Sequence, residues 1–195
     1  MFDFDKQIDR RGTNSLKWNK YKDQDVIPLW VADTDFMAPQ GVIDTLQQRI
    51  AHGVFGYSRP SPRLIELIIE RMQQRYGWKI EPEWLLFMPG VVPGLNFGIK
   101  AWCRSDQHVI TPNPVYYPFL HAPEYNNRPV SLLPMQLVND RWLPDFDTFE
   151  QQAKTADVFL LCNPHNPGGT VFTREELQRI ADIAIRNDLV VISDE

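Results

Sequence analysis

Two polar segments near the end of the sequence carry side chains suited to binding a ligand. Residues 163–170, which read Asn-Pro-His-Asn-Pro-Gly-Gly-Thr, directly follow the apolar run 158–162. Asp194 directly follows a second apolar run, residues 189–193. Short, continuous apolar runs are typical of strands buried on both faces, and the prolines in 163–170 must end the first strand. Because ligands bind beyond the carboxyl ends of parallel strands, we expect both polar segments to face one ligand.

A third segment predicts a site for an anion. Gly90 precedes a stretch of helical spacing from about Val91 to Trp102. The N–H groups in the first turn of a helix have no partner within the helix, and the helix dipole places positive charge there. The backbone of Gly90, Val91 and Val92 can therefore bind a phosphate, although every helix has such an end and the pattern alone is not specific.

A fourth segment, residues 112–119, contains three prolines and two adjacent tyrosines after a short strand predicted at 108–111. The prolines stiffen this loop. Adjacent side chains point in different directions, so at most one of Tyr116 and Tyr117 faces a given ligand. Tyr116 is alternatively a surface tyrosine that the prolines hold in place.

The elements that must position these residues alternate along the chain. Helical spacing predicts helices at residues 42–52, 62–76, 91–102, 146–154 and 174–187. Apolar runs predict strands at residues 27–33, 108–111, 128–134, 142–145, 158–162 and 189–193. Thr173 and Glu176 have the spacing of a capping box at the start of the last helix. This order predicts an α/β fold with a mostly parallel central sheet and flanking helices.

Composition excludes several classes of function. The formal charge of −5 without a basic block argues against a nucleic-acid partner. No apolar run approaches the ~20 residues of a membrane span, and residues 1–5 do not resemble a signal peptide. Cys103 and Cys162 lie in apolar segments, as buried, reduced thiols would. We therefore expect a cytoplasmic protein that contacts neither membrane nor nucleic acid.

The polar segments together resemble a known family. Residues 163–169 followed by 192–195 are similar to the pyridoxal 5'-phosphate (PLP) enzymes of fold type I. Within that fold they most resemble the cystathionine beta-lyase, or carbon–sulfur lyase, group, and segments 30–33 and 55–58 match motifs of the same group. The resemblance covers the whole chain. It implies the aspartate aminotransferase fold with PLP as the cofactor.

The resemblance implies a role for each candidate residue. In the family an acid keeps the cofactor ring nitrogen protonated, an asparagine binds the phenolic oxygen, an aromatic residue stacks on the ring and a helix start binds the phosphate. The matching positions are, in that order, Asp194, Asn166, Tyr116 and the backbone of Gly90, Val91 and Val92. Asp194 alternatively caps whatever follows the strand, and His165 either lies near Asp194 or fills the turn. Gly168, where many relatives have threonine, is expected to be tolerated because glycine adopts any backbone shape.

Two candidate residues lie earlier in the chain. In the family the tyrosine that matches Tyr57 reaches across a dimer interface to the cofactor phosphate of the partner subunit. The alternative for Tyr57 is a half-buried aromatic residue. The backbone at Ala32 is the implied neighbour of the amino-acid substrate. Asp33 or Asp35 alternatively caps a helix that begins near Pro39.

The resemblance also implies how the chain is divided. We expect residues 1–45 to form an N-terminal arm and the first part of a small domain, and 46–195 to form the first part of a large PLP-binding domain. Family members continue for about as much again, so the fold should be incomplete at its carboxyl end. Lys100 and Lys154 lie on predicted helices, in no suitable context for a Schiff base. The resemblance implies that the Schiff-base lysine and the substrate-binding arginine lie beyond Glu195. Residues 1–195 alone are therefore predicted to be inactive.

The predicted activity of the parent enzyme is a beta-elimination. It would cleave cystathionine or a related cysteine-type amino acid to a thiol, pyruvate and ammonia, as in methionine biosynthesis, and it would act as a homodimer. Three alternatives stay open: an aminotransferase of class I/II, a non-catalytic relative that binds a regulator, and a non-functional remnant.

Overall fold

The computed structural model describes residues 3–195 and divides the chain into two units, Met1–Ile68 and Ile69–Glu195. Met1 and Phe2, with which the expected arm begins, lie outside the described residues. Helix α3 crosses the boundary between the units. The predicted division after residue 45 stays a prediction.

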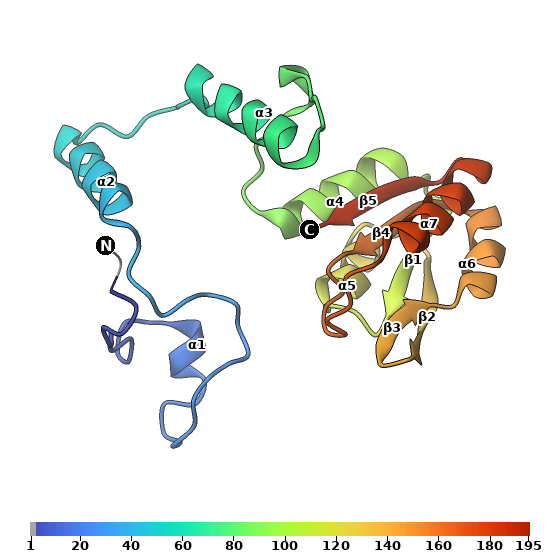
Figure 1. The fold of residues 1–195 in the computed structure, drawn as a ribbon, viewed down its shortest axis with the longest axis horizontal. Coiled ribbons are helices and arrows are strands. Elements are labelled where there is room, and N and C mark those ends of the chain that lie inside the picture. The colour runs from blue at the N-terminus through green and yellow to red at the C-terminus, as the bar shows by residue number, and fades with distance from the viewer. Residues whose placement is uncertain (1–2) are drawn as a thin grey trace. The chain divides into compact units, whose positions relative to one another are not determined.

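A five-stranded sheet forms the centre of the second unit (Figure 1). Its strands are β1 (His108–Asn113), β2 (Val130–Val138), β3 (Arg141–Pro144), β4 (Ala156–Cys162) and β5 (Val190–Asp194), in the spatial order β3-β2-β1-β4-β5. Strands β2, β1, β4 and β5 run parallel, and only the edge strand β3 pairs antiparallel, with β2. The prediction of a mostly parallel sheet agrees with this arrangement.

Helices cover both faces of the sheet. Helices α4 (Val91–Trp102) and α5 (Pro118–Tyr125) pack on one face, and α6 (Phe146–Gln152) and α7 (Arg174–Arg186) pack on the other. Alternate residues of a strand point to opposite faces, so β4 serves both cores. Its residues Val158 and Leu160 contact the first core, while Phe159 and Leu161 contact the second. Burial on both faces explains why this strand reads as a continuous apolar run.

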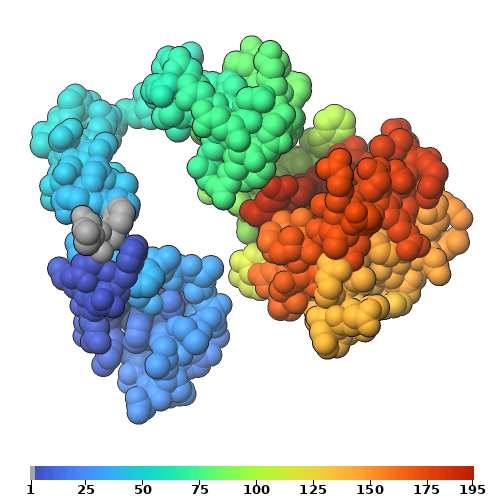
Figure 2. All heavy atoms as spheres, in the orientation of Figure 1, coloured from blue at the N-terminus to red at the C-terminus, as the bar shows by residue number. Residues whose placement is uncertain are grey.

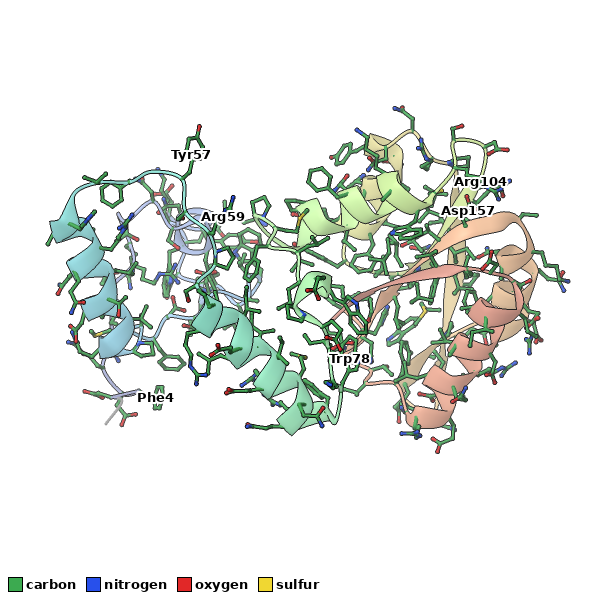
Figure 3. All side chains as sticks on the ribbon, turned by 90° about the horizontal axis from the view of Figure 1, so that it is seen from above. Phe4, Tyr57, Arg59, Trp78, Arg104 and Asp157 are labelled. Atoms are coloured by element: carbon green, nitrogen blue, oxygen red, sulfur yellow. The ribbon has the colours of Figure 1, made fainter. Side chains whose placement is uncertain are left out.

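Short polar contacts fix the ends of these elements. Thr173 and Glu176 form the predicted capping box at the start of α7. At the amino end of β4, the Asp157 carboxylate accepts hydrogen bonds from Arg104 Nε at 3.0 Å and Nη2 at 2.8 Å (Figure 3). Two 3-10 helices, Pro82–Trp84 and Ala153–Thr155, complete the unit.

The first unit contains α1 (Leu16–Asn19), α2 (Gln40–His52) and the first half of α3 (Pro62–Tyr76), which continues into the second unit. Neither α2 nor α3 buries a residue of its own, whereas Figure 2 shows close packing of the part of the chain coloured from yellow to red, which contains the sheet. The apolar faces that the sequence gives these two helices therefore lack a partner within the described residues.

The strand predicted at residues 27–33 is wrong, because the described residues of this segment pair with no other strand. Ile27 and Leu29 are 81% and 85% exposed. Pro28 between them cannot donate to a sheet. An apolar run of this kind forms a strand only where a neighbouring strand accepts its backbone hydrogen bonds. None of the helices in residues 3–195 combines the length and apolar character that crossing a membrane requires.

Candidate cofactor site

The carboxyl ends of three parallel strands meet at one edge of the sheet. Cys162 at the end of β4 pairs in register with Asp194 at the end of β5. The N–H of Asn163 donates to the carbonyl of Asp194 at 3.1 Å. The loop that contains Asn166 therefore begins beside Asp194, as expected for consecutive parallel strands.

A backbone hydrogen bond brings the loop after β1 to the same place. The N–H of Tyr116 donates to the carbonyl of Asn166 at 2.9 Å. The pKa of the Tyr116 hydroxyl is raised, first by its burial and then by its interaction with the Tyr117 hydroxyl, and the charge of Asp194 contributes. The structure thus brings Tyr116, Asn166 and Asp194 to one edge of the sheet, although their contacts with a cofactor stay predictions.

Asp194 is an acid without a cation. Burial raises the pKa of its carboxyl group. Its carboxylate forms no hydrogen bond or ion pair with the residues that the structure describes. A half-buried carboxylate is costly unless a positive group pairs with it, and a protonated pyridine nitrogen is such a group. The environment of Asp194 therefore fits PLP.

The start of α4 lies at the same edge. Gly90 has φ = 134° and precedes Val91, the first residue of α4, and no described side chain caps the helix there. Helix α4 packs directly on β5: a Cβ at Gly98 would lie 2.7 Å from Ile192 Cδ1. Figure 1 shows α4 running antiparallel to β5, so the uncapped N–H groups at its start lie near the end of β5. These groups fit the predicted binding of the phosphate.

Position 168 suits glycine because there is little space for a side chain, and not because the backbone needs an unusual conformation. Its φ is not in the left-handed range, unlike that of Gly169 at 68°. A Cβ at Gly168 would lie 2.5 Å from His165 Nδ1 and 2.7 Å from Trp142 Cδ1. The structure accommodates glycine at this position, as expected, but the reason is space and not backbone freedom: the histidine and the tryptophan occupy the volume that a side chain would need.

The sequence did not identify several residues that shape the loop 163–170. Cys162 Sγ accepts the N–H of Asn166 at 3.4 Å, and burial raises the pKa of its thiol. Thr170 Oγ1 accepts the N–H of Trp142 at 2.9 Å, which joins the loop to the edge strand β3. A buried cysteine or threonine next to a turn has no sequence pattern that separates this role from ordinary packing.

The neighbouring Tyr117 is 63% exposed, and its ring lies 4.9 Å from that of Tyr116 at an interplanar angle of 63°. Proline at the next position starts α5. The two tyrosine rings therefore contact each other edge to face at the start of this helix.

In the first unit, Tyr57 extends into solvent, fully exposed (Figure 3). The alternative of a half-buried aromatic residue does not hold in this chain. Ala32 lies in an irregular segment. Neither fact tests the predicted contacts with a partner subunit or a substrate.

Asp33 and Asp35 do not cap the next helix. The N-cap of α2 is Pro39, and no described side chain caps that end. Asp33 pairs instead with Arg10 at 2.6 Å, and Asp35 accepts hydrogen bonds from Arg10, Lys17 and Trp18. The hydrogen bond from Lys17 is the largest cause of the lowered pKa of the Asp35 carboxyl. These contacts tie the N-terminal arm to the segment that contains Ala32.

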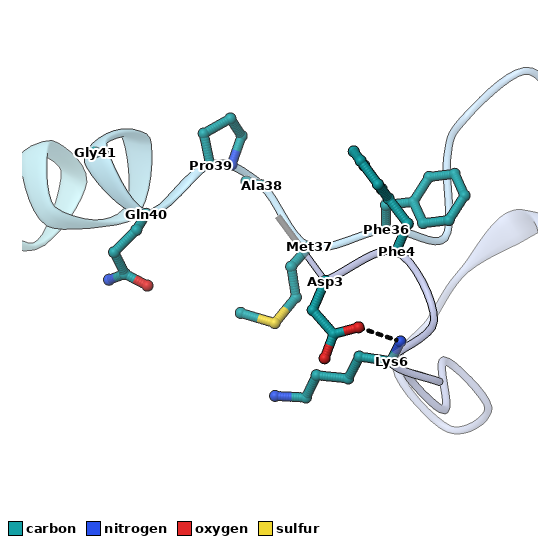
Figure 4. A pocket seen from close by; sticks show the side chains of 9 residues that line it. All are labelled: Asp3, Phe4, Lys6, Phe36, Met37, Ala38, Pro39, Gln40 and Gly41. Carbon is teal, nitrogen blue, oxygen red and sulfur yellow. Dashed lines mark hydrogen bonds between the residues drawn. The ribbon is translucent and has the colours of Figure 1, made fainter. Parts of the chain in front are cut away.

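A shallow hollow of about 490 Å³ also lies in this arm, lined by Phe4, Phe36, Met37 and Pro39 among others (Figure 4). It contains none of the residues predicted to bind the cofactor. Lys100 and Lys154, in turn, are exposed on the second unit, and Lys154 donates to Gln151. Neither lysine follows the end of a parallel strand.

An open helix start, an unpaired acid and an aromatic loop lie at the carboxyl edge of a parallel sheet, as expected for the predicted PLP site of a fold-type-I protein. Residues 24–195 match the family model of aminotransferase class I and II, and the chain belongs to that family. The predicted family, fold class and cofactor are thereby confirmed: solved structures similar to this chain contain PLP.

Several relatives carry names that agree with the predicted group. The chain is 37% identical to cystathionine beta-lyase PatB of Bacillus subtilis over 198 residues, which covers 98% of this chain and 51% of PatB. It is 49% identical to a crystal structure of OvoB, with a TM-score of 0.92, covering 100% of this chain and 52% of OvoB. The PLP-bound C-S lyase from Staphylococcus hominis is 31% identical, with a TM-score of 0.90, covering 100% of this chain and 51% of the lyase. The chain thus spans about half the length of the relatives it matches.

Proposed function

We propose that the protein containing these residues is a PLP-dependent carbon–sulfur beta-lyase. It would convert cystathionine or a related cysteine-type amino acid to a thiol, pyruvate and ammonia. The observation that carries the proposal is the half-buried, unpaired carboxylate of Asp194 at the edge of the sheet that also holds Tyr116 and Asn166. The lyase names of the relatives support this reaction over others of the same fold.

Each residue of the site would perform one task. PLP, when bound, withdraws electrons from the substrate and so makes its alpha-proton acidic. The Asp194 carboxylate would hold a proton on the ring nitrogen, since an adjacent negative charge stabilises that cation. The Asn166 amide would donate to the phenolic oxygen, and the Tyr116 ring would pack on the face of the pyridine.

The backbone would bind the other end of the cofactor. The uncapped N–H groups at Gly90, Val91 and Val92 would hold the phosphate, because they combine free donors with the positive end of the helix dipole. Valine offers no hydroxyl, so this turn would bind the phosphate by backbone alone. Ala32 would lie beside the substrate amino acid.

A second subunit would complete the site. Tyr57 is fully exposed, and the first unit leaves the large apolar side chains of α2 and α3 uncovered, as an interface would require. We infer a homodimer in which Tyr57 reaches the partner's phosphate. A cytoplasmic location and a role in methionine biosynthesis stay predictions of the sequence.

The test is an assay of the full-length protein with cystathionine. Release of pyruvate and a thiol without an added keto acid is the expected result. Amino transfer that depends on a keto acid, without pyruvate release, would refute the lyase and favour the aminotransferase. A polypeptide of residues 1–195 assayed in parallel is expected to release no pyruvate, because neither Lys100 nor Lys154 lies at the carboxyl edge of the sheet.

A further inference from the structure

His165 joins the two loops that carry Tyr116 and Asn166. Its ring nitrogen Nε2 lies 3.0 Å from the carbonyl oxygen of Pro114, 51 residues away in the chain. A carbonyl only accepts hydrogen bonds, so Nε2 carries the proton and donates it. Together with the hydrogen bond from the Tyr116 N–H to the Asn166 carbonyl, this contact joins the two loops at two points, one on each side of Val115.

The surroundings of His165 admit one protonation state. The side chain is 1% exposed, and its other nitrogen, Nδ1, has no hydrogen-bond partner among the described residues. Gly168 and Trp142 pack closely in this region, and a Cβ at Gly168 would come within 2.5 Å of Nδ1. An N–H at Nδ1 would therefore be buried without an acceptor, which costs more than leaving a lone pair unused.

We propose that His165 is a positioning residue: as the neutral tautomer protonated at Nε2, it holds the Pro114 carbonyl and thereby fixes the ring of Tyr116 relative to Asn166. The proposal rests on the proposed function, because a fixed position of Tyr116 relative to Asn166 affects PLP only if both residues bind PLP. His165 itself would touch neither cofactor nor substrate.

The geometry explains why the loop that carries Tyr116 needs a second hydrogen bond. Tyr116 is 37% exposed, so packing alone holds its ring weakly. The backbone bond from Tyr116 to Asn166 fixes one point of the loop, which could still rotate about that point. The bond from His165 to Pro114 fixes a second point two residues earlier, and two points define the direction of the segment between them.

Substitutions in the full-length protein separate this role from packing. His165→Gln keeps an N–H donor at about the position of Nε2, whereas His165→Met fills a similar volume without a donor. His108→Met is the matched control: His108 is a half-buried histidine at the opposite end of β1, with Nδ1 2.9 Å from Ser131 Oγ. The readouts are the dissociation constant for PLP, the circular dichroism of the bound cofactor and thermal unfolding without PLP.

The expected result is roughly tenfold weaker PLP binding and a smaller cofactor dichroism band for His165→Met, since one buried hydrogen bond is lost. His165→Gln should restore both, and His108→Met should change neither. Equal dissociation constants and dichroism for the Met, Gln and wild-type proteins would overturn the proposal.

If His165→Met does not fold, a comparison of His165→Asn with His165→Gln tests the same proposal. His165→Asn has the same amide as His165→Gln but is too short to reach Pro114, so it should bind PLP more weakly than the Gln variant. No difference between these two amides would also overturn the proposal. A wild-type protein that binds no PLP would refute the proposed function and this inference together, whereas one that binds PLP but transaminates refutes only the lyase activity.

Discussion

At the scale of single residues, Asp194 is the most informative position. Burial raises its pKa, and nothing among the described residues offers its carboxylate a positive charge. A group in this state destabilises the protein that lacks a ligand and stabilises a cationic ligand when one binds. The proposed contact between Asp194 and the ring nitrogen of PLP rests on this imbalance.

Asp194→Asn should weaken PLP binding by about 10- to 100-fold, because one charge-assisted buried hydrogen bond is lost. The wild-type affinity should also fall as the pH is lowered through the raised pKa of Asp194, since a neutral carboxyl group no longer attracts the ring cation. Titration of both proteins across the acidic range measures this difference. The phosphate of PLP also titrates, but equally in both, so parallel pH profiles would contradict the role of Asp194.

Gly168→Ala should destabilise the protein by about 1–3 kcal/mol, as expected for overpacking. The new Cβ would lie 2.5 Å from His165 Nδ1 and 2.8 Å from Trp142 Cγ. Denaturant unfolding measures the effect. Gly94→Ala is the control in the same unit, where a Cβ meets nothing within 4 Å and alanine favours the helix. Equal stability of the two variants would show that the side chains around Gly168 can move to accommodate the new methyl group.

At the scale of elements, the loop 163–170 is held at both ends. Strand β4 precedes it, and the capping box at Thr173 fixes the start of α7 after it. Arg141 of β3 adds hydrogen bonds to Glu176 at 2.6 and 2.8 Å and to the carbonyl of Val171 at 2.9 Å. The loop that carries Asn166 is therefore restrained by a strand, a helix and a hairpin.

Thr173→Ala should lower the free energy of unfolding by about 1 kcal/mol, because an N–H in the first turn of α7 loses its acceptor. Thr155→Ala is the matched control, since the Thr155 hydroxyl makes only a long, exposed bond of 3.5 Å. Thermal or denaturant unfolding of the full-length protein measures both. Similar losses for the two variants would mean that the capping box contributes no more than a surface hydroxyl.

At the scale of the whole molecule, the proposed site combines two subunits, with Tyr57 from one and Asp194 from the other. Variants in which the two substitutions lie on different subunits can therefore test this arrangement. Coexpressed Tyr57→Phe and Asp194→Asn subunits would form hybrid dimers, each with one native site and one site that carries both changes.

Purified hybrid dimers should recover elimination activity that exceeds the mean of the two parent variants, because half of their sites are native. Purification through two different tags and an assay of pyruvate release measure the recovery. Activity equal to the mean of the parents would place Tyr57 and Asp194 in the same subunit's site, or remove Tyr57 from the site altogether.

The sequence by itself determined the elements that local patterns control. The strand at 158–162 is continuously apolar because both of its faces are buried. Helix α7 begins at Arg174 because Thr173 before it and Glu176 three residues later form a capping box. The positions of Gly90, Asn166 and Asp194 at element ends followed from the same local rules. Only the tertiary structure decided what depends on distant segments: the bond from His165 to Pro114, the close approach of Trp142 to Gly168, and the absence of a strand at 27–33. Such contacts depend on which segments meet in space, and no periodicity or capping pattern within one segment records that.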